Sequence, residues 1–403
     1  MDKKVTYAEA ILVEAIKDSI QAAATRVLAA GNRSGGVAVA AMRRWPEAVV
    51  VAHAFDYHHA RAIRKRLLDE GLPARNVRCA AGVGVEDGAY DLAFFMTTPQ
   101  SMPAELALDQ IQDIHANLSD GGTLYAAFEG DPDDALKMMR LVWKTVNVLK
   151  RAKHAVLFKA VKHGPPVKTR DFSSTWEASV PGGKPLAFTT YPGCFCHRRP
   201  DAGGLALAEV AVREVECRMS NVQTLNSQLS TLNCLDMGCG CGLVGLLVAD
   251  AIRRQSSILN PQSSIPNPQS SILNPQSSIF NPQSSILNPQ SSITLIDSHA
   301  RAIAAAKVNA ARAGIEAEFI LSDDGLPRGR VGEYDLFVGN PPYYSDYRIA
   351  EVFLETAYRA LKPGGICLTV VKTATDLLAL QEKYFRKAEI IKRRGYCVLR
   401  SIR

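Results

Sequence analysis

The residues Asn340, Pro341, Pro342 and Tyr343 are of types that can hold an aromatic amine. They follow an apolar run at 336–338 that predicts a buried strand, and the prolines stiffen the turn because each fixes φ and lacks an N–H. Such a turn presents mainly acceptors, the Asn340 amide oxygen and the Pro341 carbonyl, and Tyr343 could lie against a planar ring. A ligand with an exocyclic amine fits these groups. A strand that simply ends in a stiff loop fits them equally well, so these residues alone leave the choice open.

A glycine-rich segment earlier in the chain, CLDMGCGCGLVG from position 234, has the composition of a cofactor-binding turn. A short apolar strand runs into Asp236, Gly238, Gly240 and Gly242, and a helical apolar stretch follows. Glycines permit a tight turn and let a cofactor approach backbone N–H groups at the start of a helix. The segment therefore predicts a strand, a cofactor-binding turn and a helix.

Carboxylate and amide side chains end the neighbouring predicted strands. Asp297 ends the strand ITLID, Asp323 ends AEFILSD, and Asn340 directly follows DLFVG. Ligands of an open α/β sheet bind beyond the carboxyl ends of its strands, so these residues and the glycine turn would share one site. Capping of the core or of a helix explains any one of them, but together with Asp236 they favour a single site.

Copies of the heptapeptide QSSILNP and its variants fill residues 255–293 without a single charge. Proline in every full copy excludes a continuous helix, and the copies are too short for the rungs of a β-solenoid. We expect a disordered or loosely extended loop. A fold can accept such a loop, because growth from about 5 to about 40 residues costs only ~2 kcal/mol of closure entropy.

The separation between Gly238 and Asp297 indicates that this repeat is an insertion. In dinucleotide-type folds the acidic residue that holds the ribose lies about 20 residues beyond the first glycine. Here the separation is 59 residues. Removing the 39 repeat residues reduces it to 20. If the last QSSI is counted as part of the strand, only 35 residues are removed and the separation is 24. The insertion would join the first helix to the second strand, at the edge of the sheet away from the predicted site.

The whole chain has the composition of an ordinary globular protein, with 403 residues of which 47% are hydrophobic and 22% charged. Glu9, Glu14 and Asp18 interrupt the apolar N-terminal stretch, and no later run is long and uncharged enough to span a bilayer. We therefore expect a cytoplasmic protein with no membrane partner.

The nine cysteines include no C-x2-C pair, which predicts free thiols and no bound metal. A net charge of +7 leans towards a polyanionic partner such as RNA, and the oligomeric state stays open.

Strand and helix signals alternate through residues 234–403, which predicts an α/β fold, and the motifs there resemble those of a known family. The glycine turn and NPPY resemble class I S-adenosylmethionine-dependent methyltransferases, where NPPY is the catalytic motif of enzymes that act on amines. Together with YPGCFCHRRPDAGGLALAE at 191–209, LDMGCGCG resembles the methyltransferase small domain family of ribosomal RNA guanine-N2 enzymes. Those relatives carry P-G-V-F-S and then D-x-G, so Cys194 and Cys196 replace Val and Ser ahead of Asp201, and NPPY replaces the usual NPPF.

The resemblance implies a reaction and a role for each motif. The implied reaction transfers a methyl group from the cofactor S-adenosylmethionine to the exocyclic N2 amine of a guanine in ribosomal RNA, either free or within a ribosomal subunit. The implied cofactor-binding residues are Asp236, Gly238, Gly240, Gly242, Asp297 and Asp323. The implied catalytic residues are Asn340, Pro341, Pro342 and Tyr343. Among them, Asp297 would hold the ribose hydroxyls and Asp323 the adenine amine.

Other functions stay open at this point. NPPY also fits a methyltransferase that acts on a protein glutamine or on the N6 amine of adenine in a nucleic acid. Glutamine enzymes of that kind carry a small helical domain in front, whereas this chain offers a second α/β domain. An inactive pseudoenzyme or RNA-binding protein is a further alternative, which the repeat makes conceivable.

The N-terminal half repeats the pattern of the second half. Its segments RVLAAGNRSGG and LSDGG match the glycine turn and LKPGG, and YDLAFFMTTPQ stands where YDLFVGNPPYY does. An alignment of VVVAHAFDYHHARAI with ITLIDSHARAI places Asp56 against Asp297. Any two α/β domains share some of these features, but we expect two tandem Rossmann-like methyltransferase domains. The first is degenerate because TTPQ replaces NPPY, and it would support RNA binding or stability.

The expected ranges are 1–165 for the degenerate domain, 166–233 for a connecting segment, 234–403 for the catalytic domain and 255–293 for the disordered insertion.

Basic residues gather where the two predicted domains join. They are Lys144, Lys150, Arg151, Lys153, Lys159, Lys162 and Lys168. A solvated helix face explains such clusters in many proteins, whereas a track for RNA between the domains is the sharper hypothesis. The expected substrate-binding residues are Phe195, Arg199, Lys150 and Arg151.

Overall fold

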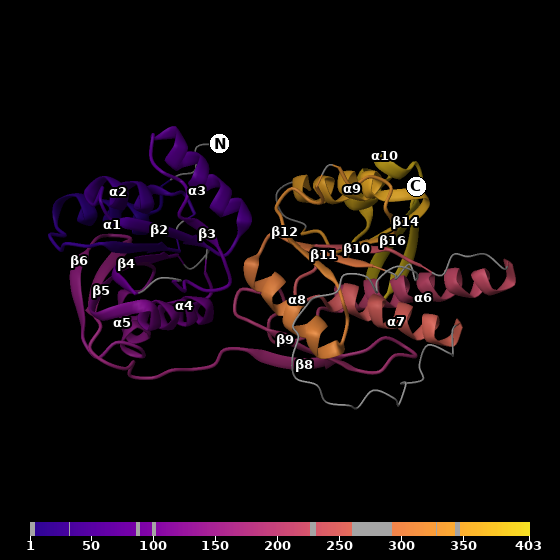
Figure 1. Ribbon diagram of the computed structural model, residues 1–403, viewed down its shortest axis with the longest axis horizontal. Helices are drawn as coiled ribbons and strands as arrows, with labels where there is room; N and C mark the ends of the chain where they lie inside the picture. Colours follow the sequence, from indigo (N-terminus) through magenta and orange to yellow (C-terminus); the bar gives the residue numbers. More distant parts are fainter. Residues whose placement is uncertain are drawn as a thin grey trace, which may run out of the picture.

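The computed structural model describes residues 5–31, 33–85, 89–98, 102–225, 231–259, 292–327, 329–342 and 347–403 (Figure 1). These residues form two α/β domains that lie side by side, each built on a seven-stranded sheet. The strand order is β3-β2-β1-β4-β5-β7-β6 in the first sheet and β12-β11-β10-β13-β14-β16-β15 in the second. The two orders are the same, position by position, so the prediction of two tandem α/β domains is confirmed.

The first domain contains the elements from α1 to β7. Its helices are α1 (Tyr7–Asp18), α2 (Gly36–Arg44), α3 (Tyr57–Asp69), α4 (Ala104–Asn117) and α5 (Pro132–Arg140). Its strands are β1 (Arg26–Ala30), β2 (Val49–Ala54), β3 (Val77–Cys79), β4 (Tyr90–Thr97), β5 (Leu118–Glu129), β6 (Val146–Arg151) and β7 (Ala155–Val161). The first five strands in sequence are parallel, and β7 and β6 add an antiparallel edge.

The second domain contains the remaining elements. Its helices are α6 (Ala202–Leu225), α7 (Leu243–Leu259), α8 (Ala300–Ala313), α9 (Arg348–Ala360) and α10 (Thr375–Phe385). The strands of its large sheet are β10 (Cys234–Met237), β11 (Ile293–Asp297), β12 (Glu318–Leu321), β13 (Tyr334–Gly339), β14 (Leu361–Val371), β15 (Glu389–Arg393) and β16 (Tyr396–Ile402). A two-stranded hairpin, β8 (Ser174–Ala178) with β9 (Leu186–Thr190), precedes α6, and residues of both join the core of this domain.

Helices cover both faces of each sheet, because apolar side chains on successive residues of a strand point to opposite faces. In β1, Val27 and Ala29 join one apolar core, whereas Leu28 and Ala30 join the core on the other face. The second sheet is likewise buried between two cores. The carboxyl ends of the strands are therefore the exposed edge at which loops can build a site.

The heptapeptide repeat lies mostly outside the described residues. Its first five residues, 255–259, continue α7 as helix, and its last residue, Ile293, is the first residue of β11. The expected loop is therefore shorter at both ends than 255–293. The chain enters β11 from the amino edge of the sheet, opposite the edge where Asp297 ends the strand.

The register of the two sheets identifies the equivalent residues of the two domains. In the first domain, Ala54 ends β2 and Asp56 precedes α3. In the second domain, Asp297 ends β11 and His299 precedes α8. Asp56 is therefore equivalent to His299, and the predicted match of Asp56 with Asp297 is wrong by two residues. The alignment of the two sequences missed this register, because strand pairing and not local identity fixes it.

The two domains touch through equivalent backbone positions. The Tyr57 N–H donates to the Ser298 carbonyl at 2.8 Å, and the Ala300 N–H donates to the Phe55 carbonyl at 2.7 Å. In the register above, Tyr57 corresponds to Ala300 and Phe55 to Ser298, so the contact obeys an approximate two-fold axis. Asp56 and His299 form a β-bridge at that axis. The carboxyl ends of β2 and β11 consequently face each other across the interface.

Candidate active site

Strand pairing brings most of the predicted site residues to one edge of the second sheet. Met237 of β10 pairs with Ile296 of β11 on one side and with Gly339 of β13 on the other. The residues that follow these three partners are Gly238, Asp297 and Asn340. Asp297 in turn pairs with Leu321 of β12, two residues before Asp323. The glycine turn, both acidic residues and the NPP turn therefore meet, as the sequence predicts.

The glycine turn has a backbone that only glycine adopts easily. Gly238, Gly240 and Gly242 have φ of 70°, 55° and 86°, the left-handed region that disfavours a side chain. A Cβ built at Gly238 would lie 2.8 Å from the Phe353 ring. A Cβ built at Gly240 would meet no heavy atom within 4 Å among the described residues. The middle of the turn thus opens onto free space, in which a ligand can approach the backbone.

Asp236 lies beneath this turn. Its side chain is 2% exposed, and it accepts a hydrogen bond from the Gly245 N–H of α7 at 2.8 Å. Burial raises the pKa of this carboxyl to about 7, and the nearby charge of Asp297 adds to the shift. The sequence predicts a cofactor ligand here, and the structure places the side chain in the core, where it braces the turn against α7.

Asp297 reaches the turn from the end of β11. One of its oxygens accepts from the Gly240 N–H at 2.9 Å and the other from the His299 N–H at 2.8 Å. Desolvation raises the pKa of the carboxyl above its ordinary value, and these two donors partly offset the effect. The side chain is half-buried, so it stands at the boundary between the core and the open space beside Gly240.

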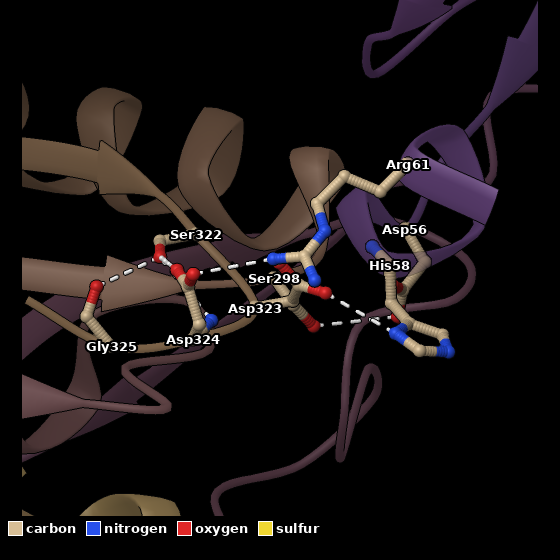
Figure 2. A network of polar contacts seen from close by, with 8 residues as sticks. All are labelled: Asp56, His58, Arg61, Ser298, Ser322, Asp323, Asp324 and Gly325. Atoms are coloured by element: carbon tan, nitrogen blue, oxygen red, sulfur yellow. Dashed lines mark hydrogen bonds and ion pairs between the residues drawn. The ribbon is translucent and has the colours of Figure 1, made fainter. Parts of the chain in front are cut away.

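Asp323 is held by the first domain, a contact that sequence analysis missed. Figure 2 shows Arg61 and His58 of α3 pointing at its carboxylate, with Arg61 Nη1 at 2.9 Å and His58 Nδ1 at 3.2 Å. Arg61 also reaches Asp324 at 3.2 Å. The Asp323 side chain is only 8% exposed. The basic start of α3 is visible in the sequence, but its partner appears only when the two domains dock.

The NPP turn follows β13 directly. The Asn340 side chain is half-buried, and its Nδ2 donates to Asp201 Oδ2 at 2.9 Å. Pro341 is buried and Pro342 is half-buried. Tyr343 lies outside the described residues, so its predicted stacking role stays a prediction. Asp201 comes from the D-x-G segment at the start of α6, a contact that sequence analysis also missed.

The segment 191–200 runs between the two domains into Asp201. Arg198 forms an ion pair with Glu105 of α4 in the first domain, and Arg301 of α8 donates to the Pro192 carbonyl at 3.0 Å. On this segment the Phe195 side chain is 69% exposed, and Arg199 is exposed as well. These two predicted substrate-binding residues therefore lie at the surface. They shortly precede Asp201, which contacts Asn340.

Lys150 and Arg151 of the basic cluster do not lie between the domains. Lys150 and Arg151 belong to β6, the edge strand at the opposite end of the first sheet from β3, and Figure 1 shows β6 far from the second domain. Lys150 pairs with Glu14 at 2.6 Å and Arg151 with Asp133 at 3.9 Å. The location predicted for an RNA track is wrong, because the sheet order sends this strand to the outer edge. Whether these two residues bind RNA stays a prediction.

Comparisons with known proteins agree with this geometry. Residues 283–400 match the family model of the methyltransferase small domain. The chain is 28% identical to the ribosomal RNA small subunit methyltransferase C of Pseudomonas entomophila over 81% of this chain and 83% of that protein. It is also 23% identical to the ribosomal RNA large subunit methyltransferase G of Pseudomonas paraeruginosa over 81% of this chain and 75% of that protein.

Among solved structures, the T. thermophilus 16S rRNA N2 G1207 methyltransferase, in complex with AdoMet and guanosine, has the same fold. The TM-score is 0.66 at 18% identity, and the match covers 98% of this chain and 92% of that one. The match therefore extends over both domains.

Among its described residues, the first domain lacks the side chains that line the candidate site of the second domain. In the register of the sheets, Arg33 takes the place of Gly240, Ala54 that of Asp297, and Ala81 that of Asp323. Met96 takes the place of Asn340, so the residues that replace NPPY begin at Met96 and not at Thr97 as the sequence predicts. The equivalent edge of the first sheet therefore carries neither the acids nor the acceptor turn.

No cluster of three or more His, Cys, Asp or Glu side chains suited to a metal ion occurs within the described ranges. Among the helices of the described part of the chain, none combines the length and apolarity needed to cross a membrane.

Proposed function

We propose that this protein transfers a methyl group from S-adenosylmethionine to the exocyclic N2 amine of a guanine in ribosomal RNA. The observation that carries the proposal is the placement of the NPP turn beside the glycine turn, at the ends of two paired strands. One of these turns offers acceptors for an amine, and the other offers open space beside Gly240. We place the reaction in the cytoplasm, where ribosomal RNA or a ribosomal subunit would be the partner.

The residues present fit the cofactor. Gly240 leaves room for the methionine part, because its Cβ position is open and its backbone lies at the surface of the turn. Asp297 stands where ribose hydroxyls would find an acceptor. Asp323 already accepts from Arg61 and His58, and the adenine amine would use a remaining lone pair of its carboxylate. Asp236 keeps the turn in place from below. S-adenosylmethionine supplies a methyl group made electrophilic by a positively charged sulfur.

The chain's own contribution is the orientation of the target amine. An aromatic amine is a poor nucleophile because its lone pair is delocalised into the ring. The Asn340 oxygen and the Pro341 carbonyl would each accept one N–H, which favours a tetrahedral nitrogen with its lone pair directed at the methyl group. Such positioning contributes several kcal/mol in well-oriented reactions, on the order of 7–11 at the limit. A dedicated base is not required, since the amine becomes acidic once methylated.

The target base must leave its stack to reach this turn, because the reacting amine lies in the plane of a paired base. The exposed Phe195 ring is suited to contact such an extruded base, and Arg199 to contact the backbone. Tyr343, which follows the NPP turn in the sequence, is the proposed stacking partner within the pocket. The names of the similar proteins, all ribosomal RNA methyltransferases, support RNA as the substrate class.

Transfer of labelled methyl groups tests the proposal. The purified protein is incubated with labelled S-adenosylmethionine and, in parallel, with 16S RNA, 23S RNA, each ribosomal subunit and a peptide release factor. We expect label in RNA, recovered as N2-methylguanosine after digestion to nucleosides. Label in adenosine or in the release factor would replace the proposal with one of the two alternatives, and absence of label from every substrate would refute it.

A further inference from the structure

Asp201 performs two tasks with one carboxylate. It precedes the first residue of α6, and its Oδ2 accepts from the Gly204 N–H at 2.6 Å, the geometry of a helix N-cap. The same oxygen accepts from Asn340 Nδ2 at 2.9 Å, although the two residues are 139 positions apart. A capping residue needs only the first of these contacts. The second one joins α6 to the turn that is proposed to hold the target amine.

The surroundings of Asp201 are shaped for this carboxylate. A Cβ built at Gly203 would lie 3.3 Å from Asp201 Oδ2, and one built at Gly204 would lie 3.2 Å from it. Both distances are tighter than ordinary contact, so glycine at these two positions leaves the oxygen room. On the other side, the Cys196 thiol approaches Oδ1 at 3.8 Å as a weak donor. Donors therefore surround the carboxylate.

The partner fixes which way the Asn340 amide faces. An asparagine side chain carries a donor NH2 on one side and an acceptor oxygen on the other, and a half-turn exchanges them. A carboxylate only accepts, so the NH2 must face Asp201 and the oxygen must face the opposite way. In the exchanged orientation the amide oxygen would meet the carboxylate, and the NH2 would meet the N–H groups of the target amine. Both contacts would be repulsive.

We infer that Asp201 is a positioning residue, which locks the Asn340 amide with its oxygen towards the target amine. The inference rests on the proposed function, because only an amine substrate needs an acceptor at that point. It also gives a purpose to the D-x-G segment, whose aspartate the proposed chemistry otherwise leaves without a role.

The substitution Asp201→Ser separates the two tasks. Serine is a good N-cap and can still accept from the Gly204 N–H, but its shorter side chain does not reach Asn340. We expect kcat for methyl transfer to RNA to fall about tenfold or more, as when one oriented hydrogen bond to a transition state is lost. The Kd for S-adenosylmethionine and the thermal midpoint should stay near the wild-type values.

Asp131→Ser is the matched control, because Asp131 caps α5 in the first domain through the N–H groups of Asp133 and Asp134. It makes the same substitution at a helix cap without a link to Asn340, and it should leave kcat unchanged. A double-mutant cycle of Asp201→Ser and Asn340→Ala, read from urea unfolding, should reveal coupling between the two positions.

Several outcomes would overturn the inference. Wild-type kcat in Asp201→Ser would show that Asn340 needs no anchor, and zero coupling in the cycle would show that the contact contributes nothing. Loss of S-adenosylmethionine affinity in parallel with kcat would make Asp201 a cofactor ligand instead. In each of these cases wild-type methyl transfer to RNA persists and the proposed function stands. A wild-type protein that transfers no methyl group would refute the proposed function, and this inference with it.

Discussion

At the scale of single residues, the polar side chains of the site differ in how deeply they are buried. Asp236 is inside the core, Asp297 stands at its boundary, and Asn340 is half-buried beside Asp201. The residue types could be predicted from the sequence, because strand-end acids and a Pro-Pro turn are local features. The contact between Asp201 and Asn340 could not, since it joins positions that only the folded sheet and α6 bring together.

Replacement of Asn340 should separate catalysis from cofactor binding. Asn340→Ala removes one of the two proposed acceptors for the amine and leaves the glycine turn and Asp297 intact. We expect methyl transfer to fall by about a hundredfold or more, in the range found when an oriented hydrogen-bonding group is removed from an active site. Calorimetry should give a Kd for S-adenosylmethionine close to that of the wild type. An equal loss of transfer and binding would contradict this division of roles.

The buried carboxyl of Asp236 should make stability depend on pH. Its pKa is raised to about 7 from an ordinary value of 3.8, so the folded state holds the proton more tightly than the unfolded state. The stability that this group contributes is complete below pH 3.8 and is lost as the pH rises through 7. Above that pH the folded protein carries a buried charge.

Asp236→Asn removes this titration and keeps an oxygen for the Gly245 N–H. We expect the substitution to raise the thermal unfolding midpoint by about 5 °C more at pH 8 than at pH 5. Scanning calorimetry at the two pH values measures the difference. An equal change at both values would show that the carboxyl does not titrate in this range.

At the scale of elements, the loops at the carboxyl ends of the strands carry the site, and their positions follow from sheet order. The alternating strand and helix signals predicted the α/β fold but not the strand order. That the heptapeptide repeat is an insertion stays a prediction, which rests on the glycine-to-acid spacing that its removal restores. The alignment of the two halves could not be set from local letters, and Asp56 was matched two residues away from its equivalent. The docking of α3 on Asp323 was beyond prediction, because nothing in α3 alone indicates its partner.

The glycine turn offers a test of the proposed cofactor pocket. Gly240→Ala places a methyl group in the open space and strains a backbone at φ 55°, at a cost of about 1–2 kcal/mol. Gly364→Ala is the matched control, because Gly364 has φ of 78° and a Cβ there would also meet nothing within 4 Å among the described residues. Both should lower the unfolding midpoint, but only Gly240→Ala should weaken S-adenosylmethionine binding, by about tenfold. Similar affinities in the two variants would place the cofactor elsewhere.

Helix α3 should influence the cofactor through Asp323. Arg61 and His58 each occupy one oxygen of that carboxylate and so hold it in one orientation. Arg61→Met should weaken S-adenosylmethionine binding about threefold, a modest effect because half of the Arg61 side chain is in water. Lys65→Met on the same helix, which breaks only an exposed pair with Asp69, should have no effect. Tighter binding in Arg61→Met would mean that Arg61 competes with the adenine amine.

At the scale of the whole molecule, the two domains share one strand order but differ in the side chains at the ends of their strands. The second domain has the glycine turn, the acids and the NPP turn, whereas the first has Arg33, Ala54 and Ala81 at the corresponding positions. The first domain still contributes by contact, through α3 and through Glu105 of α4. The supporting role that the sequence predicts for the first domain stays a prediction, to which the structure adds a direct contact with Asp323.

Charge reversal on β6, at the outer edge of the first domain, tests whether this edge binds RNA. Lys150→Glu combined with Arg151→Glu reverses two charges on β6, far from the site. If this edge holds RNA, the affinity should fall and the slope of log Kd against log salt should decrease by about 2. Filter binding at several salt concentrations measures both quantities. Unchanged affinity and slope would restrict the RNA contacts to the vicinity of Phe195 and Arg199.

The approximate two-fold axis between the domains has a consequence for how this protein can change over generations. In a dimer of identical subunits, every substitution at the axis appears in both subunits. A substitution that improves the function of one subunit therefore also changes the same position in the other. Here Asp56 and His299, which meet at that axis, are encoded separately. Each half can therefore mutate without altering its counterpart, and one half is free to become a dedicated scaffold for the other.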